Sequence, residues 1–448
     1  LLDYTKNVYL SFLKKHLITQ PMNLNKVIHQ IVVLPLFLLM ATYTNAQNSI
    51  STQNLSGKNI NTITTAVPFL LISPDSRSGA MGDVGVAIKP DANSTHWNPA
   101  KLAFIDDSKD MGFSMSYSPW LRALVNDINL AYLTGYKKLD RNSAIGVSLR
   151  YFSLGNITFT DNFGATIRDF KPNEFSLDAC YSRKLSTNLS AGLSARYIYS
   201  NLTGGTNVGG ADTKPGQSVS TDLSLYYVTN EFKVAEKKAD VAIGMNISNI
   251  GAKMAYTDNA ERDFIPTNLR LGTAFNMEID EFNEFTFAFD ANKLLVPTQP
   301  VYQQENGTVV YGPDGSPIIF SGRNPNVGVA SGIFGSFADA PGNVIIDDDG
   351  NTVDVESGSR FVEELNEINL SVGMEYIYSQ LFAVRAGYFH EHPTKGNRRF
   401  LSLGAGVRYK VLELDLSYLL ALTQQSPLAN TLRFSLKFNF GDDGKQEE

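Results

Sequence analysis

The sequence predicts an all-β fold: a 14-stranded antiparallel transmembrane β-barrel with an N-terminal plug segment. Apolar and polar side chains alternate in segment after segment between residues 111 and 440, and the connections between these segments alternate between short and long. Composition excludes the main competing classes of protein. Of the 448 residues, 43% are hydrophobic and 11% aromatic, which is too apolar for a disordered chain. The one uninterrupted apolar run, 31–41, is too short to span a bilayer as a helix.

The segment 1–46 has the pattern of an export leader and is excluded from the fold. Lys26 precedes the apolar run 31–40, and the small-residue site 44–46 follows it, which is the order of a secretory signal peptide. We expect cleavage at the end of this site and translation from Met22, so that everything before Met22 is an upstream extension. The alternative interpretation is an amphipathic N-terminal helix.

Fourteen segments show the alternation. In the last of them, apolar residues at even positions alternate with Arg433, Ser435 and Lys437. Because successive side chains of a strand point to opposite faces, each segment has one apolar and one polar face. Most segments reach the ~9–11 residues that a tilted membrane strand needs. The expected strands are 111–118, 127–137, 143–154, 173–184, 188–200, 219–229, 239–249, 267–278, 284–292, 367–378, 381–390, 399–410, 412–421 and 431–440.

A soluble β-sandwich would also alternate, so the connections are the better guide. They are short after even-numbered strands and longer after odd-numbered ones, and the longest is 293–366. Outer-membrane barrels have an even number of strands, short periplasmic turns and longer extracellular loops. The sequence therefore favours a barrel over 111–440 in the outer membrane, with 293–366 outside. Both mature termini, including the tail 441–448, are expected in the periplasm.

The segment 47–110 precedes the first strand and is expected to form an N-terminal extension and a plug. A barrel of fourteen strands is wider than the eight-stranded size that side chains can fill, so its lumen is either open or occupied. The run 76–88 is rich in glycine and alanine, which allow one backbone to approach another closely. We expect residues 76–105 to pack inside the barrel.

Residues of this segment also carry a family resemblance. The chain resembles the FadL-type outer-membrane channels, which are fourteen-stranded barrels with a plug, in a signature formed by Arg77, Gly79, Gly82, Gly85, Trp97, Asn98 and Pro99. The stretches 65–70, 74–77 and 332–341 resemble more closely the PorV family, the FadL-like component of the type IX secretion system of Bacteroidetes. The resemblance covers essentially the whole chain after residue 46.

The resemblance implies a non-enzymatic role in protein secretion. Members of the PorV family bind the large translocon barrel and collect cargo with a C-terminal sorting domain. They deliver this cargo to a surface attachment complex with a sortase-like protease. The alternatives that it implies are a channel for hydrophobic small molecules and a lipid A deacylase. We expect outer-membrane lipid around the barrel and no cofactor. The formal net charge of −7 argues against a nucleic-acid partner.

No residue emerges as catalytic, cofactor-binding or metal-binding. His390 and His392 share a strand face but lack a third ligand, so a solvated loop is the preferred interpretation. The acidic run 347–350 resembles part of a calcium loop, but its first position would be Ile345, which cannot ligate. A polar hairpin tip is the better prediction there. Cys180 is the single cysteine and has no partner.

The long loop 293–366 contains the candidate partner site. Ile333, Phe334 and Phe337 form an apolar patch in an otherwise polar loop, and such patches mark interaction sites when they are exposed. The alternative is a small satellite core that folds over the barrel mouth, and the PorV resemblance favours contact with the translocon barrel. A basic partner surface would suit the acidic residues of the loop, which are Asp339, Asp347, Asp348, Asp349, Asp354, Glu356, Glu363 and Glu364.

Overall fold

A computed structural model describes residues 60–441, apart from 123–124, 126, 161–162, 206, 209–210, 259–261 and 424–425. The expected signal peptide and upstream extension lie outside the described residues, as does nearly all of the tail 441–448. None of the helices described is long and apolar enough to cross a membrane.

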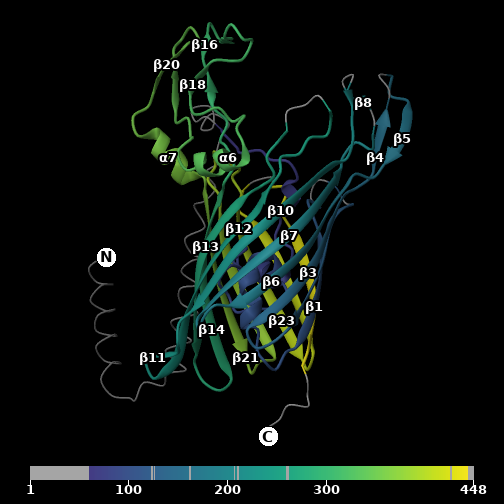
Figure 1. Cartoon of the computed structure of the whole chain (residues 1–448), viewed down its shortest axis with the longest axis vertical. Coiled ribbons are helices and arrows are strands. Elements are labelled where there is room, and N and C mark those ends of the chain that lie inside the picture. The colour runs from purple at the N-terminus through teal and green to yellow at the C-terminus, as the bar shows by residue number, and fades with distance from the viewer. Residues whose placement is uncertain are drawn as a thin grey trace, which may run out of the picture. The chain divides into compact units, whose positions relative to one another are not determined.

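Fourteen antiparallel strands form a closed barrel (Figure 1), which confirms the predicted fold class and strand number. Neighbours in sequence are neighbours around the barrel, and the last strand pairs with the first. The short strand β11 (Phe232–Val234) only prolongs one turn. The barrel strands are β1 (Met111–Pro119), β2 (Ile128–Lys138), β3 (Ser143–Leu154), β6 (Asn173–Lys184), β7 (Leu189–Asn201), β10 (Gly216–Val228), β12 (Lys237–Gly251), β13 (Asn268–Glu278), β14 (Asn283–Leu294), β21 (Ile368–Tyr378), β22 (Phe382–His390), β23 (Arg399–Tyr409), β24 (Leu412–Ala421) and β25 (Thr431–Phe440).

The alternation places apolar side chains on the outside of the barrel and polar ones in the lumen. In β25, Leu432 and Phe434 are exposed, whereas Arg433, Ser435 and Lys437 are buried. This arrangement is the reverse of a soluble protein, and it suits a barrel whose outer face is covered by lipid. The closed sheet rules out the sandwich alternative.

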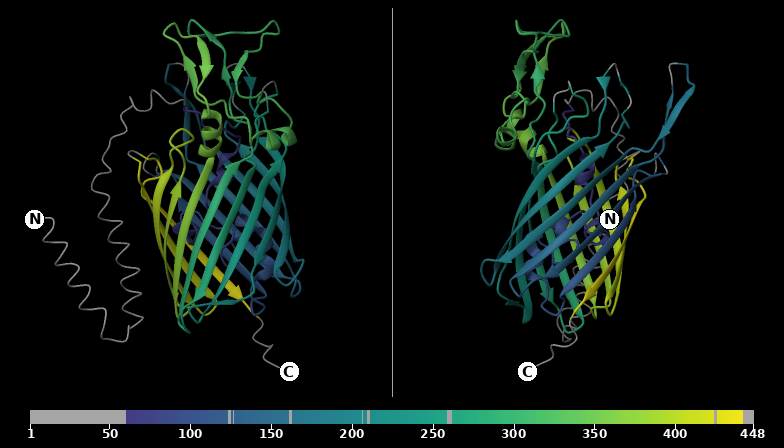
Figure 2. Two further views of the ribbon diagram at one scale, coloured as in Figure 1. Left: turned by 90° about the vertical axis from the view of Figure 1, so that its left-hand side faces the viewer. Right: turned by 45° about the vertical axis from the view of Figure 1, so that its right-hand side comes forward.

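Short turns gather at one end of the barrel and long loops at the other (Figure 2). The turn between β21 and β22 has Ser379 and Gln380 at φ 53° and 55°, the left-handed pair of a tight type I′ turn. At the opposite end, loop 293–366 carries α6 (Val329–Gly335) and α7 (Ser359–Asn366). The small strands of the long loops are β4 (Ile157–Thr160), β5 (Thr166–Phe170), β8 (Asn207–Val208), β9 (Ala211–Asp212), β15 (Val301–Tyr302), β16 (Gln304–Glu305), β17 (Thr308–Val309), β18 (Ile319–Ser321), β19 (Val344–Ile346) and β20 (Thr352–Val355).

Loop length predicts the orientation in the membrane. We expect an epitope inserted within 305–312 to be labelled by antibody on intact cells, because long loops of outer-membrane barrels face outward. An epitope placed after Asp443 should be labelled only after the outer membrane is permeabilised. Labelling in the reverse pattern would show that the orientation is wrong.

A lumen segment, residues 66–105, fills the barrel. It contains η2 (Pro68–Leu71), α4 (Ser76–Ala80), α5 (Ser94–Trp97) and η3 (Pro99–Phe104). Asp75 begins α4, because its carboxylate accepts a hydrogen bond from the amide of Ser78 at 3.0 Å. The main apolar core lies between this segment and the inner wall, and it includes Met81, Val84, Val86, Ala87, Ile88, Ala100, Tyr226, Ala242, Ala274 and Ala288.

Candidate functional site

Backbone groups of the lumen segment are hydrogen-bonded by side chains of the barrel wall. The Gly82 amide donates to Ser402 Oγ at 2.8 Å. The amides of Gly85 and Val86 both donate to Asp290 Oδ2, at 2.8 and 3.1 Å. A buried irregular segment needs such partners because it has no regular backbone ladder of its own. The polar inner face of the barrel therefore holds a plug-like segment in place.

The three glycines of the family signature lie where no side chain fits. A Cβ on Gly82 would stand 2.6 Å from both N and O of Tyr388, which are backbone atoms of β22. A Cβ on Gly79 would overlap the Arg433 guanidinium, and one on Gly85 would overlap the ring of Trp97. Gly79 and Gly82 thus allow the segment to approach the wall closely, and Gly85 allows the segment to pack against its own Trp97.

A buried ion network joins the lumen segment to the wall strands β21, β22 and β24. Arg77 on α4 binds both carboxylate oxygens of Glu375, at 3.0 and 2.8 Å. Arg385 binds the same carboxylate at 2.6 Å and Asp415 at 2.7 Å. Arg77 also lies 3.2 Å from Asp91 of the lumen segment itself. Because the Arg77 guanidinium makes two parallel hydrogen bonds to Glu375, it fixes both the position and the angle of α4.

The remaining signature residues organise the segment internally. Trp97 Nε1 donates to Asp75 Oδ1 at 2.6 Å, which ties α5 to the start of α4. The Asn98 amide group donates to the Leu225 carbonyl of β10 at 3.0 Å, and its oxygen caps η3. Pro99 is the first residue of η3, where its missing N–H costs nothing.

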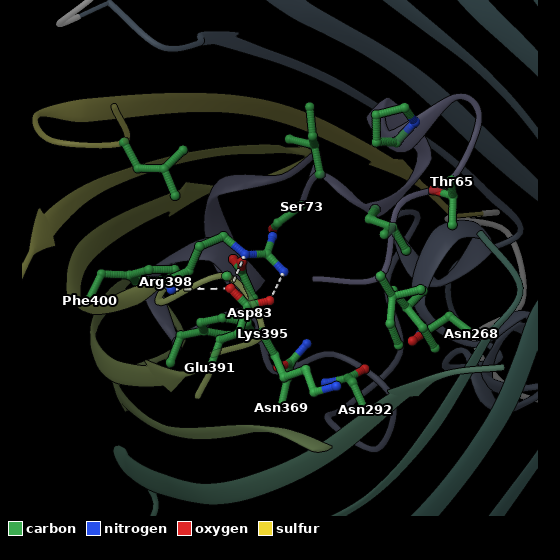
Figure 3. A pocket seen from close by; sticks show the side chains of 18 of the residues that line it. Thr65, Ser73, Asp83, Asn268, Asn292, Asn369, Glu391, Lys395, Arg398 and Phe400 are labelled. Atoms are coloured by element: carbon green, nitrogen blue, oxygen red, sulfur yellow. Dashed lines mark hydrogen bonds and ion pairs between the residues drawn. The ribbon is translucent and has the colours of Figure 1, made fainter. Parts of the chain in front are cut away.

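Two cavities remain on opposite sides of the lumen segment, with volumes of about 410 and 370 Å³. Figure 3 shows the larger one, on the side of the long loops, where Arg398 pairs with Glu391 beside Lys395 and Asp83. A continuous apolar groove in the lumen would favour a channel for hydrophobic molecules. The lining of this cavity is mixed, because apolar side chains such as Leu71, Trp120 and Phe400 lie beside these charged groups.

The predicted partner patch lies on α6 and on the turn that follows it. Phe334 is 78% exposed and Phe337 is 50% exposed, whereas Ile333 is half-buried. The opposite side of α6 is docked, because Gly332 lies so close to the Phe264 ring that a Cβ would stand 2.7 Å from it. A satellite core would bury the two phenylalanines, so their exposure favours a binding surface.

The acidic residues of the loop divide into two groups. Glu364 accepts hydrogen bonds from the amides of Asp339 and Ala340 at 2.7 and 2.8 Å, and Glu363 accepts one from Gly342 at 2.7 Å. Burial, together with the nearby carboxylates, raises the pKa of Asp339 to about 6. These three acidic residues stabilise the fold of the loop, whereas the others of the expected set are exposed.

One charged cluster was not predicted from the sequence. Asp339, Glu364 and Glu367 bring three carboxylates within reach of a single ion. Lysine ammonium groups occupy that space instead: Lys395 lies 3.0 Å from Glu367, and Lys293 lies 3.2 Å from Glu364. The cluster therefore anchors the loop to the barrel rim, and a metal would have to displace both lysines.

The other motifs have structural roles where the chain is described. Asp347 accepts hydrogen bonds from its own turn between β19 and β20, including one from the Asn351 amide at 2.7 Å, as predicted for a polar hairpin tip. His390 contacts Tyr388 at 3.1 Å, and His392 contacts Thr394 at 2.8 Å, without converging on a common ion. Cys180 is buried on the lumen side of β6.

Comparison with known proteins identifies a family. A family model described as "Type IX secretion system protein PorV" matches residues 55–301. No curated protein matches the chain. Similar solved structures include the Pseudomonas putida toluene transporter TodX, with a TM-score of 0.43 and 14% identity over 82% of this chain and 98% of that one. The Ralstonia pickettii toluene transporter TbuX has a TM-score of 0.41 and 10% identity, over 82% and 98%. A Pseudomonas aeruginosa FadL homologue has a TM-score of 0.38 and 11% identity, over 85% and 99%.

Proposed function

The chain belongs to the PorV family of type IX secretion system proteins, and on this premise we propose that it is a non-enzymatic adaptor of protein secretion. It binds the large translocon barrel of that system in the outer membrane. It then receives cargo with a C-terminal sorting domain and passes it to the surface attachment complex that contains a sortase-like protease.

The observation that carries this proposal is the apolar patch on α6. Phe334 exposes its aromatic ring from a helix that is docked on its other side, and Phe337 exposes its ring from the turn that follows. Aromatic anchors on a fixed support lose little conformational freedom on binding, and they dominate the energy of many interfaces. The patch thus suits a protein partner that supplies a complementary pocket.

The occupied lumen favours a role as an adaptor over a role as the pore through which cargo passes. The ion network of Arg77 and Glu375 and the Gly82 contact hold the lumen segment across the barrel. Cargo that passed through this barrel would first have to break these buried interactions. The proposal therefore places cargo on the extracellular loops, while the translocon supplies the pore. The alternatives are a channel for hydrophobic small molecules, to which the larger cavity offers a partly apolar lining, and a lipid A deacylase.

The test replaces Ile333, Phe334 and Phe337 together with serine. If each aromatic truncation costs ~2 kcal/mol, partner affinity should fall by roughly 30-fold or more per anchor. We expect the translocon partner to be lost from affinity isolations of gently solubilised outer membrane. Cargo should then accumulate in the periplasm.

A matched control replaces Tyr311, Ile318 and Val353 with serine. These residues are also apolar and exposed in the same loop, on its hairpins rather than on α6. The control should keep both partner recovery and secretion, and both variants should reach normal abundance in the outer membrane. If the α6 variant secretes as well as the control, the patch has no role in binding the translocon.

A further inference from the structure

Helix α7 exposes an apolar face that the proposed function does not use. Phe361, Val362 and Leu365 are 68, 55 and 50% exposed, and at helical spacing they share one side of α7. Three large apolar side chains so exposed on a short helix are costly in water. Some apolar surroundings are therefore expected to cover them.

The opposite side of α7 is fixed to the molecule, so the helix cannot turn its apolar face inward. Glu363 binds Lys395 at 2.6 Å, and Glu364 binds Lys293 at 3.2 Å. Arg360 donates to Ser321 Oγ at 3.0 Å. These contacts come from the barrel rim and from the loop, and they hold the polar side of α7 from both directions.

The position of α7 along the chain places this face at the edge of the membrane. The helix ends at Asn366, and β21 begins two residues later at Ile368. Leu370 and Met374 of β21 are exposed on the lipid-facing side of the barrel. Eight helical residues span only about 12 Å, so the whole of α7 lies close to the end of the apolar belt. Figures 1 and 2 show α7 at this rim, on the end of the barrel with the long loops.

We propose that the apolar face of α7 inserts among the acyl chains of the lipid leaflet around the extracellular end of the barrel. Interfacial amphipathic helices bind in this way, with the apolar face buried about 5–10 Å into the boundary between headgroups and chains. Here the face prolongs the lipid-covered surface that β21 already presents. A face of three side chains falls well short of the roughly 800 Å² per partner of a stable protein interface, so lipid is the occupant that fits it.

Insertion would give the loop a second attachment to the membrane. The ion pairs of Lys293 with Glu364 and of Lys395 with Glu363 hold α7 to the barrel, and the lipid contact would hold it from the outside. Because α7 and α6 belong to the same loop, the lipid contact would fix the height of the loop above the bilayer. This role is independent of whether the α6 patch binds a translocon.

The test measures quenching of a tryptophan at position 361. The Phe361→Trp variant of the full chain is reconstituted without any partner into phosphatidylcholine bilayers, either plain or with brominated acyl chains. The wild-type emission of Trp97 and Trp120 is subtracted. For an inserted ring we expect bromine near the headgroup end of the chains to remove about half of the added emission.

Tyr311→Trp is the matched control, since Tyr311 is 62% exposed on a distal hairpin of the same loop. Its added emission should be unchanged by brominated lipid. Equal, weak quenching at both positions would overturn the proposal. It would also be overturned if the emission of Phe361→Trp shifted to the blue only when purified translocon was added, because the occupant would then be protein.

Discussion

Replacing Gly82 with leucine is expected to prevent the barrel from folding around its lumen segment. The backbone of Gly82 has a φ of +71°, and a Cβ there would stand 2.6 Å from backbone atoms of Tyr388. The left-handed conformation costs a larger residue about 1–2 kcal/mol. Overpacking against a strand that is paired on both sides adds about 1–3 kcal/mol or more. Together these costs approach the ~5–15 kcal/mol that stabilise a typical protein.

Heat-modifiable migration on gels reports this folding directly. Gly307→Leu is the matched control, because Gly307 has a φ of +70° but no atom within 4 Å of its Cβ position. The control has only the conformational cost of the left-handed backbone, without a steric clash, so it should fold. A Gly82→Leu barrel that folds but conducts ions in a planar bilayer would show that the lumen segment had been expelled. Normal migration together with normal conductance would show that the segment is not packed against β22.

Period-two alternation made the barrel predictable, because a membrane strand must expose one face to lipid along its whole span. All fourteen strands follow from that rule, and most boundaries agree within about two or three residues, as such predictions do. The boundary errors lie mainly beyond the apolar belt. For example, β10 begins at Gly216, three residues before the predicted start, because its ladder continues into the loop without an apolar face to mark it.

The contacts of the lumen segment were less predictable than its position. Glycine-rich sequence and family resemblance both indicated a plug that includes Arg77. Its partner Glu375 follows 298 residues later, and the alternation of β21 shows only that this side chain faces the lumen. Helix α7 is not predictable from the sequence for a similar reason. Its eight residues lie inside a long loop, and the lysines that fix it come from distant strand ends.

The second large effect is expected from Glu375→Leu. Its side chain is fully buried and compensates two guanidinium groups, those of Arg77 and Arg385. Removing one partner of a buried ion pair leaves uncompensated charge in a low-dielectric interior and costs about 3–5 kcal/mol. We expect the midpoint of guanidinium-induced unfolding in detergent to fall sharply. Leucine has a similar volume, so the loss would come from charge and not from a cavity.

Glu284→Leu is the matched control for Glu375→Leu. It tests whether the loss of any carboxylate from the barrel wall would lower the stability equally. Glu284 also pairs with a cation of the lumen segment, Lys89, at 2.7 Å, but the two side chains are 20 and 40% exposed. Exposed pairs contribute about 0–1 kcal/mol, so this variant should unfold almost as the wild type does. The double variant Arg77→Met with Glu375→Leu should recover much of the stability, because it restores charge balance around Arg385 and Asp415. If Glu375→Leu is no less stable than Glu284→Leu, the buried network does not hold the plug, and close packing at the glycines must do so alone.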